Sequence, residues 1–217
     1  EFSHCLGLPD FYETSPLSHG YFGMSRWSLM DYGCYNNDTY TPCAYTAYER
    51  NFLGWMDIET PEPNTVYTIK SLDDGGKAYK IASDDPNEYY IVENIQQTGW
   101  NRYAAANGLQ VTHVNYYPQR WEDNTPNNFM DQSMTIIPAD NNLITSGGKA
   151  VEDYLVGDLY PYNGNNKLTA TSTPAATLYR STNNLEKPIY NITRNDDGTV
   201  SFFYMPDIPY APTRLAS

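Results

Sequence analysis

Two residues at the start of the chain, Glu1 and His4, have the types and the spacing of a zinc-dependent hydrolytic site. They fill the second and fifth places of the pattern H-E-x-x-H, whose first histidine would come directly before Glu1. On a helix, positions i and i+4 lie on one face, so the two imidazoles of this pattern can bind one Zn²⁺. The glutamate between them reaches the water that the metal polarises and acts as general base. The opening residues therefore predict the end of a zinc-binding helix.

Three later residues make this prediction more specific. Gly7 lies three residues after His4, Asp10 lies six residues after it, and Met30 follows in the segment RWSLMDYG. A glycine at this place permits the sharp turn that brings a third ligand back to the metal, and a carboxylate oxygen is an acceptable zinc ligand. A methionine turn beneath the metal is the second landmark of such sites. The order Glu1, His4, Gly7, Asp10 and Met30 therefore favours a zinc site.

These motifs resemble those of the immune inhibitor A-like family of secreted bacterial zinc metalloproteases, whose metzincin-type motif is H-E-x-x-H-x-x-G-x-x-D. The segments GLPDFY, WSLM and FLGW resemble sequences that are typical of that family. The resemblance implies that His4 and Asp10 are zinc ligands, that Glu1 is the general base and that Met30 forms the floor under the metal. Tyr32 would contact the zinc or stabilise the tetrahedral oxyanion. The alternative for Tyr32 is a structural role, as one tyrosine among 21.

The resemblance also bears on the whole chain. It implies that the chain is the C-terminal part of a secreted zinc metalloendopeptidase. Such an enzyme hydrolyses proteins or peptides with a zinc-activated water. Because the first ligand histidine is missing before Glu1, we expect this chain to be inactive alone and to need the N-terminal part of the protease domain as a partner. We expect a bacterial protein that is secreted, cell-surface or periplasmic. The alternative is a non-catalytic extracellular β-sandwich that binds protein or glycan.

The elements that would position these residues divide the chain into two parts. The segment TPCAYTAYERNFLGW predicts a helix over residues 41–54, with Thr41 as N-cap and Pro42 at the first helical position. The proline-rich segment IETPEPNT then marks a boundary. We therefore predict a C-terminal subdomain of a metzincin-like protease over 1–60, a β-sandwich over 61–206 and a tail over 207–217.

Seven short segments after this boundary are β-branched or aromatic, and several alternate apolar with polar residues. They are TVYTIKSL, KAYKIAS, EYYIVENI, LQVTHVNY, SMTIIPA, PIYNITRN and TVSFFYM. Turn signals such as Asn107-Gly108 and Asp197-Gly198 separate them. The pattern predicts an antiparallel β-sandwich, so the fold class is mainly β with a small α part.

Composition and charge exclude some classes of function. The chain has 217 residues and a formal net charge of -13. Nucleic-acid binding depends on Lys and Arg that neutralise phosphates, so we do not expect a nucleic-acid partner. The sequence contains no run of 18 apolar residues, so we expect no membrane span.

Two further features leave alternatives open. Cys34 and Cys43 are spaced for a small disulfide loop, or they are free buried thiols. Calcium is a second candidate cofactor, because the segments DNNLITSGG, NDDGT and SLDDGG carry clustered carboxylate and amide oxygens. None of them matches a full EF-hand loop, and we interpret them first as turns.

Overall fold

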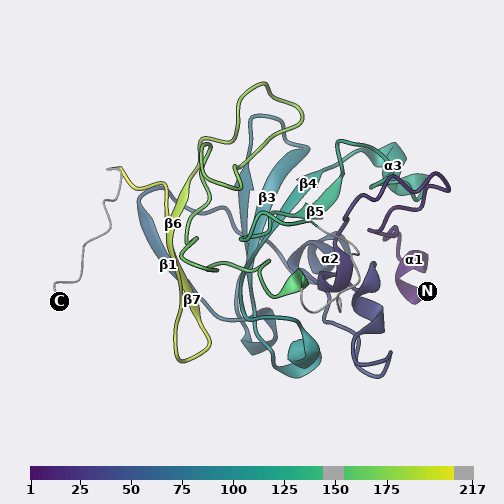
Figure 1. Cartoon of the computed structure of the whole chain (residues 1–217), viewed down its shortest axis with the longest axis horizontal. Helices are drawn as coiled ribbons and strands as arrows, with labels where there is room; N and C mark the ends of the chain where they lie inside the picture. The colour runs from purple at the N-terminus through teal and green to yellow at the C-terminus, as the bar shows by residue number, and fades with distance from the viewer. Residues whose placement is uncertain (144–153, 208–217) are drawn as a thin grey trace.

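Two antiparallel sheets form the body of the molecule (Figure 1). A computed structural model describes residues 1–143 and 154–207 of the chain. The four-stranded sheet has the order β2-β3-β4-β5, with β2 Tyr79–Ala82, β3 Glu88–Ile95, β4 Gly108–Asn115 and β5 Met134–Ile136. The three-stranded sheet has the order β1-β7-β6, with β1 Thr65–Ile69, β7 Val200–Tyr204 and β6 Ile189–Arg194. Six of the predicted strand segments contain one of these strands, and LQVTHVNY overlaps β4, which begins one residue earlier, at Gly108. The mainly β prediction is therefore confirmed.

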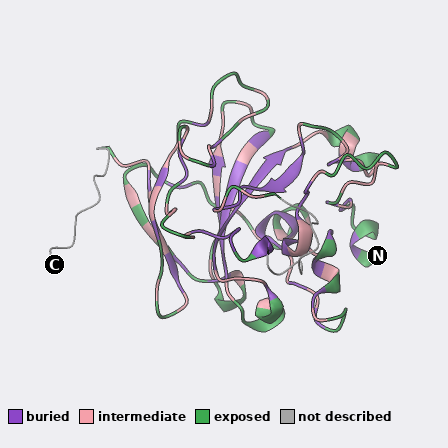
Figure 2. Cartoon of the chain, viewed as in Figure 1, coloured by how far each residue is buried: buried purple, intermediate pink, exposed green. Residues whose placement is uncertain are grey.

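The four-stranded sheet is buried on both of its faces. Along β3, Tyr90 and Val92 point into a hydrophobic cluster shared with the three-stranded sheet. Ile91 and Ile95, which alternate with them, point into a second cluster on the other face. Every residue of β4 is buried, as a strand in a central layer requires (Figure 2).

The N-terminal segments cover the face of this sheet that the three-stranded sheet leaves free (Figure 1). Phe11, Trp27 and Tyr48 of this layer pack in one cluster with Val114 of β4 and with Trp121. Residues on both sides of position 60 therefore share a core. That residues 1–60 form a metzincin-like subdomain stays a prediction, and the predicted tail lies outside the described residues except for Asp207.

Short helices connect and cap these layers. They are α1 Phe2–Cys5, α2 Ala47–Phe52 and α3 Pro118–Glu122, with 3₁₀ turns at Ser25–Trp27, Tyr32–Tyr35, Leu72–Asp74 and Gly99–Tyr103. In the described part of the chain, no helix has the length and apolar character needed to cross a membrane.

The start of the predicted helix over 41–54 was wrong, because a stronger cap lies further along the chain. The side chain of Thr46 accepts a hydrogen bond from the Glu49 N–H, and the Glu49 carboxylate accepts one from the Thr46 N–H. This reciprocal capping box starts α2 at Ala47. The predicted end is confirmed, since α2 stops before Gly54, which has φ of 71°.

Candidate metal centre

A turn at Gly7 brings the end of α1 back toward Asp10. His4 lies on α1, and its carbonyl accepts a hydrogen bond of 2.9 Å from the Gly7 N–H. Gly7 has φ of 94°, a left-handed conformation that side chains strain. The turn that the sequence predicted is therefore present, and it reverses the chain within a few residues.

The imidazole of His4 is held between a carbonyl and a carboxylate. Its Nδ1 lies 2.7 Å from the carbonyl oxygen of Leu8, and its Nε2 lies 3.3 Å from Oδ1 of Asp10. A carbonyl oxygen can only accept, so Nδ1 carries a proton and Nε2 is the nitrogen that faces Asp10. A proton on Nε2, or a cation bound between Nε2 and Oδ1, makes this close approach favourable.

This pair fits zinc in donor type and in separation. Zinc bonds to histidine nitrogen and carboxylate oxygen are about 2.0–2.2 Å, which places two tetrahedral ligands about 3.3–3.5 Å apart. The Nε2–Oδ1 separation of 3.3 Å lies in this range. The hydrogen bond from Nδ1 to the Leu8 carbonyl is of the kind that orients histidines in known metal sites. Across residues 1–143 and 154–207, no group of three or more His, Cys, Asp or Glu side chains is arranged to hold a metal.

The structure brings all of the predicted site residues to one cavity. A cavity of about 570 Å³ is lined by Glu1, His4, Asp10, Met30 and Tyr32, among others. A neighbouring cavity of about 710 Å³ shares the first three of these residues. Glu1 is exposed, and its side chain makes no capping hydrogen bond to α1. Its carboxylate is therefore open to solvent beside the His4–Asp10 pair.

Hydrogen bonds from α2 hold the turn that carries Met30. The Met30 side chain is buried, and the Met30 carbonyl accepts a hydrogen bond of 2.7 Å from the Phe11 N–H. Ser28 Oγ accepts from the Met30 N–H at 3.0 Å and donates to Glu49 Oε1 at 2.5 Å. Sequence reasoning missed Glu49, although the T-x-x-E spacing from Thr46 is a capping signal.

Asp31 connects this turn to its neighbours. It is buried, and its carboxylate accepts hydrogen bonds from the backbone N–H groups of Met24, Ser25 and Tyr32. Burial raises the pKa of Asp31 to about 7, although these three hydrogen bonds oppose the increase. Asp31 therefore fixes the backbone of the candidate catalytic residue Tyr32.

Two tyrosines stand beside the His4–Asp10 pair. Tyr32 is about half exposed, and its ring centroid lies 6.0 Å from that of Tyr12. Burial and then the charge of Asp31 raise the pKa of Tyr32, while burial and the neighbouring Asp10 raise the pKa of Tyr12 to about 12. Both phenols are therefore hydrogen-bond donors at neutral pH. Sequence reasoning did not predict Tyr12, which lies two residues after Asp10.

Asn124 is a contact of the site that no sequence signal indicated. Its amide Nδ2 donates to Asp10 Oδ2 at 2.8 Å, and its Oδ1 accepts from the Asp10 N–H at 2.7 Å. It follows α3 and lies 114 positions from Asp10 in the sequence. The segment that carries Asp10 therefore contacts the part of the chain that also carries the four-stranded sheet.

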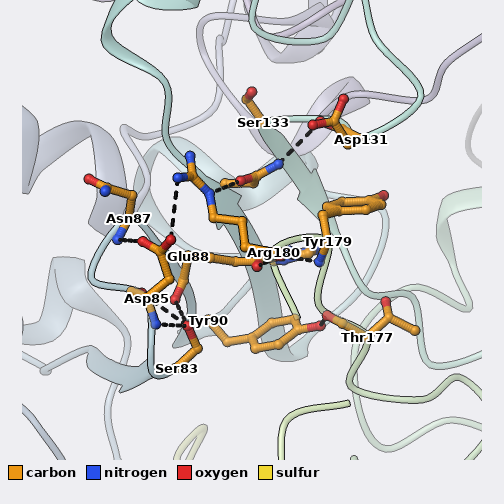
Figure 3. A network of polar contacts seen from close by, with 12 residues as sticks. Ser83, Asp85, Asn87, Glu88, Tyr90, Asp131, Ser133, Thr177, Tyr179 and Arg180 are labelled. Carbon is orange, nitrogen blue, oxygen red and sulfur yellow. Dashed lines mark hydrogen bonds and ion pairs between the residues drawn. The ribbon is translucent and has the colours of Figure 1, made fainter. Parts of the chain in front are cut away.

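A second polar network lies at one end of the central strands β3 and β4 of the four-stranded sheet (Figure 3). Glu88 accepts from the backbone N–H groups of Tyr179 and Arg180 at 2.6 and 2.8 Å, and the ring of His113 lies 2.9 Å from it. Burial opposes ionisation, but these hydrogen bonds hold the pKa of Glu88 below its usual range. Arg180 also donates to Asn115 Oδ1 at 2.7 Å. Glu88 and His113 are buried, and their network holds residues 177–180 against the sheet.

The remaining candidates serve local structure. Cys34 and Cys43 are free thiols, so the disulfide alternative is excluded. In SLDDGG, Asp73 forms an ion pair with Arg50 of α2. In NDDGT, Asp197 accepts a hydrogen bond from the Thr199 N–H, as expected of a turn. The segment DNNLITSGG lies partly outside the described residues. Calcium binding stays a prediction.

Comparisons with protein-family models, with curated proteins and with solved structures found no match. The family resemblance seen in the sequence is therefore neither supported nor opposed by a known protein, and it stays a prediction.

Proposed function

We propose that this chain is the C-terminal part of a secreted bacterial zinc metalloendopeptidase, with His4 and Asp10 as two of the zinc ligands. The observation that carries the proposal is the separation of 3.3 Å between His4 Nε2 and Asp10 Oδ1, with Nδ1 held by the Leu8 carbonyl. Both the distance and the tautomer suit a shared zinc ion.

The residues around this pair have the roles that peptide hydrolysis needs. A zinc ion bound there would polarise a water molecule and the scissile carbonyl. The carboxylate of Glu1 takes a proton from the attacking water and returns it to the leaving amine nitrogen. The phenol of Tyr32 donates a hydrogen bond to the oxygen on which negative charge develops, and its raised pKa keeps that proton in place.

A third ligand has to come from outside the residues described above. We propose a histidine directly before Glu1 in the natural chain, on the same face of the helix as His4. The preceding part of the protease domain would supply the other wall of the substrate cleft. The substrate is then a polypeptide that lies along the cavity of Glu1, His4 and Asp10.

Casein hydrolysis by the longest natural chain that contains this sequence tests the proposal. We expect cleavage that 1,10-phenanthroline abolishes and that added zinc restores. His4→Ala removes a ligand and should abolish cleavage, while His19→Ala is the matched control and should retain it. Cleavage that resists the chelator, or that survives His4→Ala, contradicts the proposal.

A second candidate function, binding of an extracellular protein or glycan, is favoured by a separate apolar cavity. It encloses about 620 Å³, and its lining includes Tyr45, Trp55 and Trp100. Trp55 and Trp100 are more than half exposed, which suits an aromatic binding surface. Retained binding to a glycan or matrix-protein array by a chain without zinc would favour this function. Loss of that binding in Trp55→Ala and Trp100→Ala would assign it to this cavity.

A further inference from the structure

The loop of residues 124–128 contacts residues 10–15 through three asparagine side chains, of which only Asn124 bonds Asp10. Asn124 bonds Asp10 at two points, and Asn127 Nδ2 donates to the Phe11 carbonyl at 2.7 Å. Asn128 Oδ1 accepts from the backbone N–H groups of Thr14 and Ser15 at 2.8 and 3.0 Å. We call this loop the asparagine clamp.

Asn124 determines which oxygen of Asp10 is available. The side-chain N–H of Asn124 donates a hydrogen bond to Asp10 Oδ2, and the side-chain oxygen of Asn124 accepts one from the Asp10 backbone N–H. The carboxylate is thereby oriented with Oδ1 toward His4 Nε2. A free carboxylate can bind a cation through one or both oxygens, whereas one with Oδ2 engaged binds through Oδ1. The neutral amide also leaves the negative charge of Asp10 available to the cation.

The clamp is itself rigid. Asn127 is fully buried, and beyond Phe11 it bonds the Met134 carbonyl and the N–H groups of Ser133 and Met134. Before the loop, Trp121 of α3 packs 6.1 Å from the ring of Phe11. Asn124 has φ of 55°, so its backbone is also fixed in a specific turn. Through these contacts, the loop holds Asp10 at a fixed place relative to β5.

We propose that Asn124 is a positioning residue for the zinc site and that it fixes Asp10 as a ligand through one oxygen. The inference rests on the proposed function, because it requires zinc at His4 and Asp10. It gives a residue after position 60 a part in metal binding that acts through Asp10. Partners of this kind change metal affinity by about 10–100-fold when they are removed.

Zinc affinity, measured by competition with a chromophoric chelator in the longest natural chain, tests the role of Asn124. Asn124→Gly removes the amide and suits the left-handed backbone, so the fold should be retained. We expect about 10–100-fold weaker zinc binding. Asn128→Ala is the matched control, since it removes contacts to Thr14 and Ser15 without touching Asp10. It should lower stability to urea and leave zinc affinity unchanged.

The possible outcomes distinguish the positioning role of Asn124 from the zinc site itself. Unchanged zinc affinity in Asn124→Gly, or an equal loss in Asn128→Ala, overturns the positioning role while the zinc site stands. A wild-type chain that binds no zinc overturns the proposed function and this inference with it. Crystal structures of the zinc-free proteins give a second measurement. Asp10 should occupy one rotamer in the wild type and several in Asn124→Gly, and a single unchanged rotamer in the variant contradicts the inference.

Discussion

Glu93 provides a test of how the N-terminal layer is attached to the four-stranded sheet. Its carboxylate is fully buried on β3, and Oε1 accepts a hydrogen bond of 3.0 Å from the N–H of Ala47, the first residue of α2. Burial raises the pKa of Glu93 from 4.5 to about 7, although the Ala47 N–H and the charge of Arg50 oppose the increase. The folded protein therefore holds this proton more tightly than the unfolded chain does.

The sign of the pH dependence follows from this difference. The stabilisation by protonated Glu93 is fully present below the unfolded pKa of 4.5 and is lost as the pH rises through about 7. A pKa difference of this size corresponds to about 3 kcal/mol of unfolding free energy. The contribution of Glu93 to stability should thus be lost between about pH 4 and about pH 8.

The variant Glu93→Gln isolates this effect. Glutamine keeps the acceptor oxygen for the Ala47 N–H and carries no charge at any pH. In urea unfolding, the unfolding free energy of Glu93→Gln relative to wild type should rise by about 3 kcal/mol between about pH 4 and about pH 8. The exposed Glu62→Gln is the control and should follow the wild type. Parallel pH curves for wild type and Glu93→Gln would refute the reasoning.

Three further substitutions test other parts of the account. Tyr32→Phe removes the oxyanion donor and should lower kcat on a peptide substrate about 100-fold with little change in KM; an unchanged kcat removes Tyr32 from the mechanism. Asn127→Leu deprives the Phe11 carbonyl and neighbouring backbone groups of their partner, and urea unfolding should show a loss of about 3 kcal/mol rather than none. Gly23→Ala places a Cβ 2.1 Å from the Phe11 carbonyl oxygen, so its thermal stability should fall well below that of Gly20→Ala, whose Cβ meets nothing within 4 Å.

The strands could be predicted because each carries its own signal. Segments such as EYYIVENI and TVSFFYM combine β-branched and aromatic residues, and turn residues bound them. The start of α2 could not be chosen in the same way. Both Thr41 and Thr46 are good N-caps. The helix starts after Thr46 because the buried Glu49 accepts hydrogen bonds from the Thr46 N–H and from the Ser28 hydroxyl.

The candidate site was predictable as far as it is local in sequence. His4, Gly7 and Asp10 lie within seven consecutive residues, so their spacing could predict that His4 and Asp10 lie close together. Asn124 could not be found in this way, because its contact with Asp10 depends on how α3 packs against Phe11. Glu93 was hidden for a similar reason, since a carboxylate on a strand gives no sign that a helix N-terminus will lie against it.

Zinc at His4 and Asp10 is the central claim, and anomalous X-ray scattering tests it most directly. Crystals of the longest natural chain, grown with zinc, would be measured on both sides of the zinc absorption edge. We predict an anomalous peak about 2.0–2.2 Å from both His4 Nε2 and Asp10 Oδ1. A map with no peak between these two atoms, or with zinc bound elsewhere, would contradict the claim.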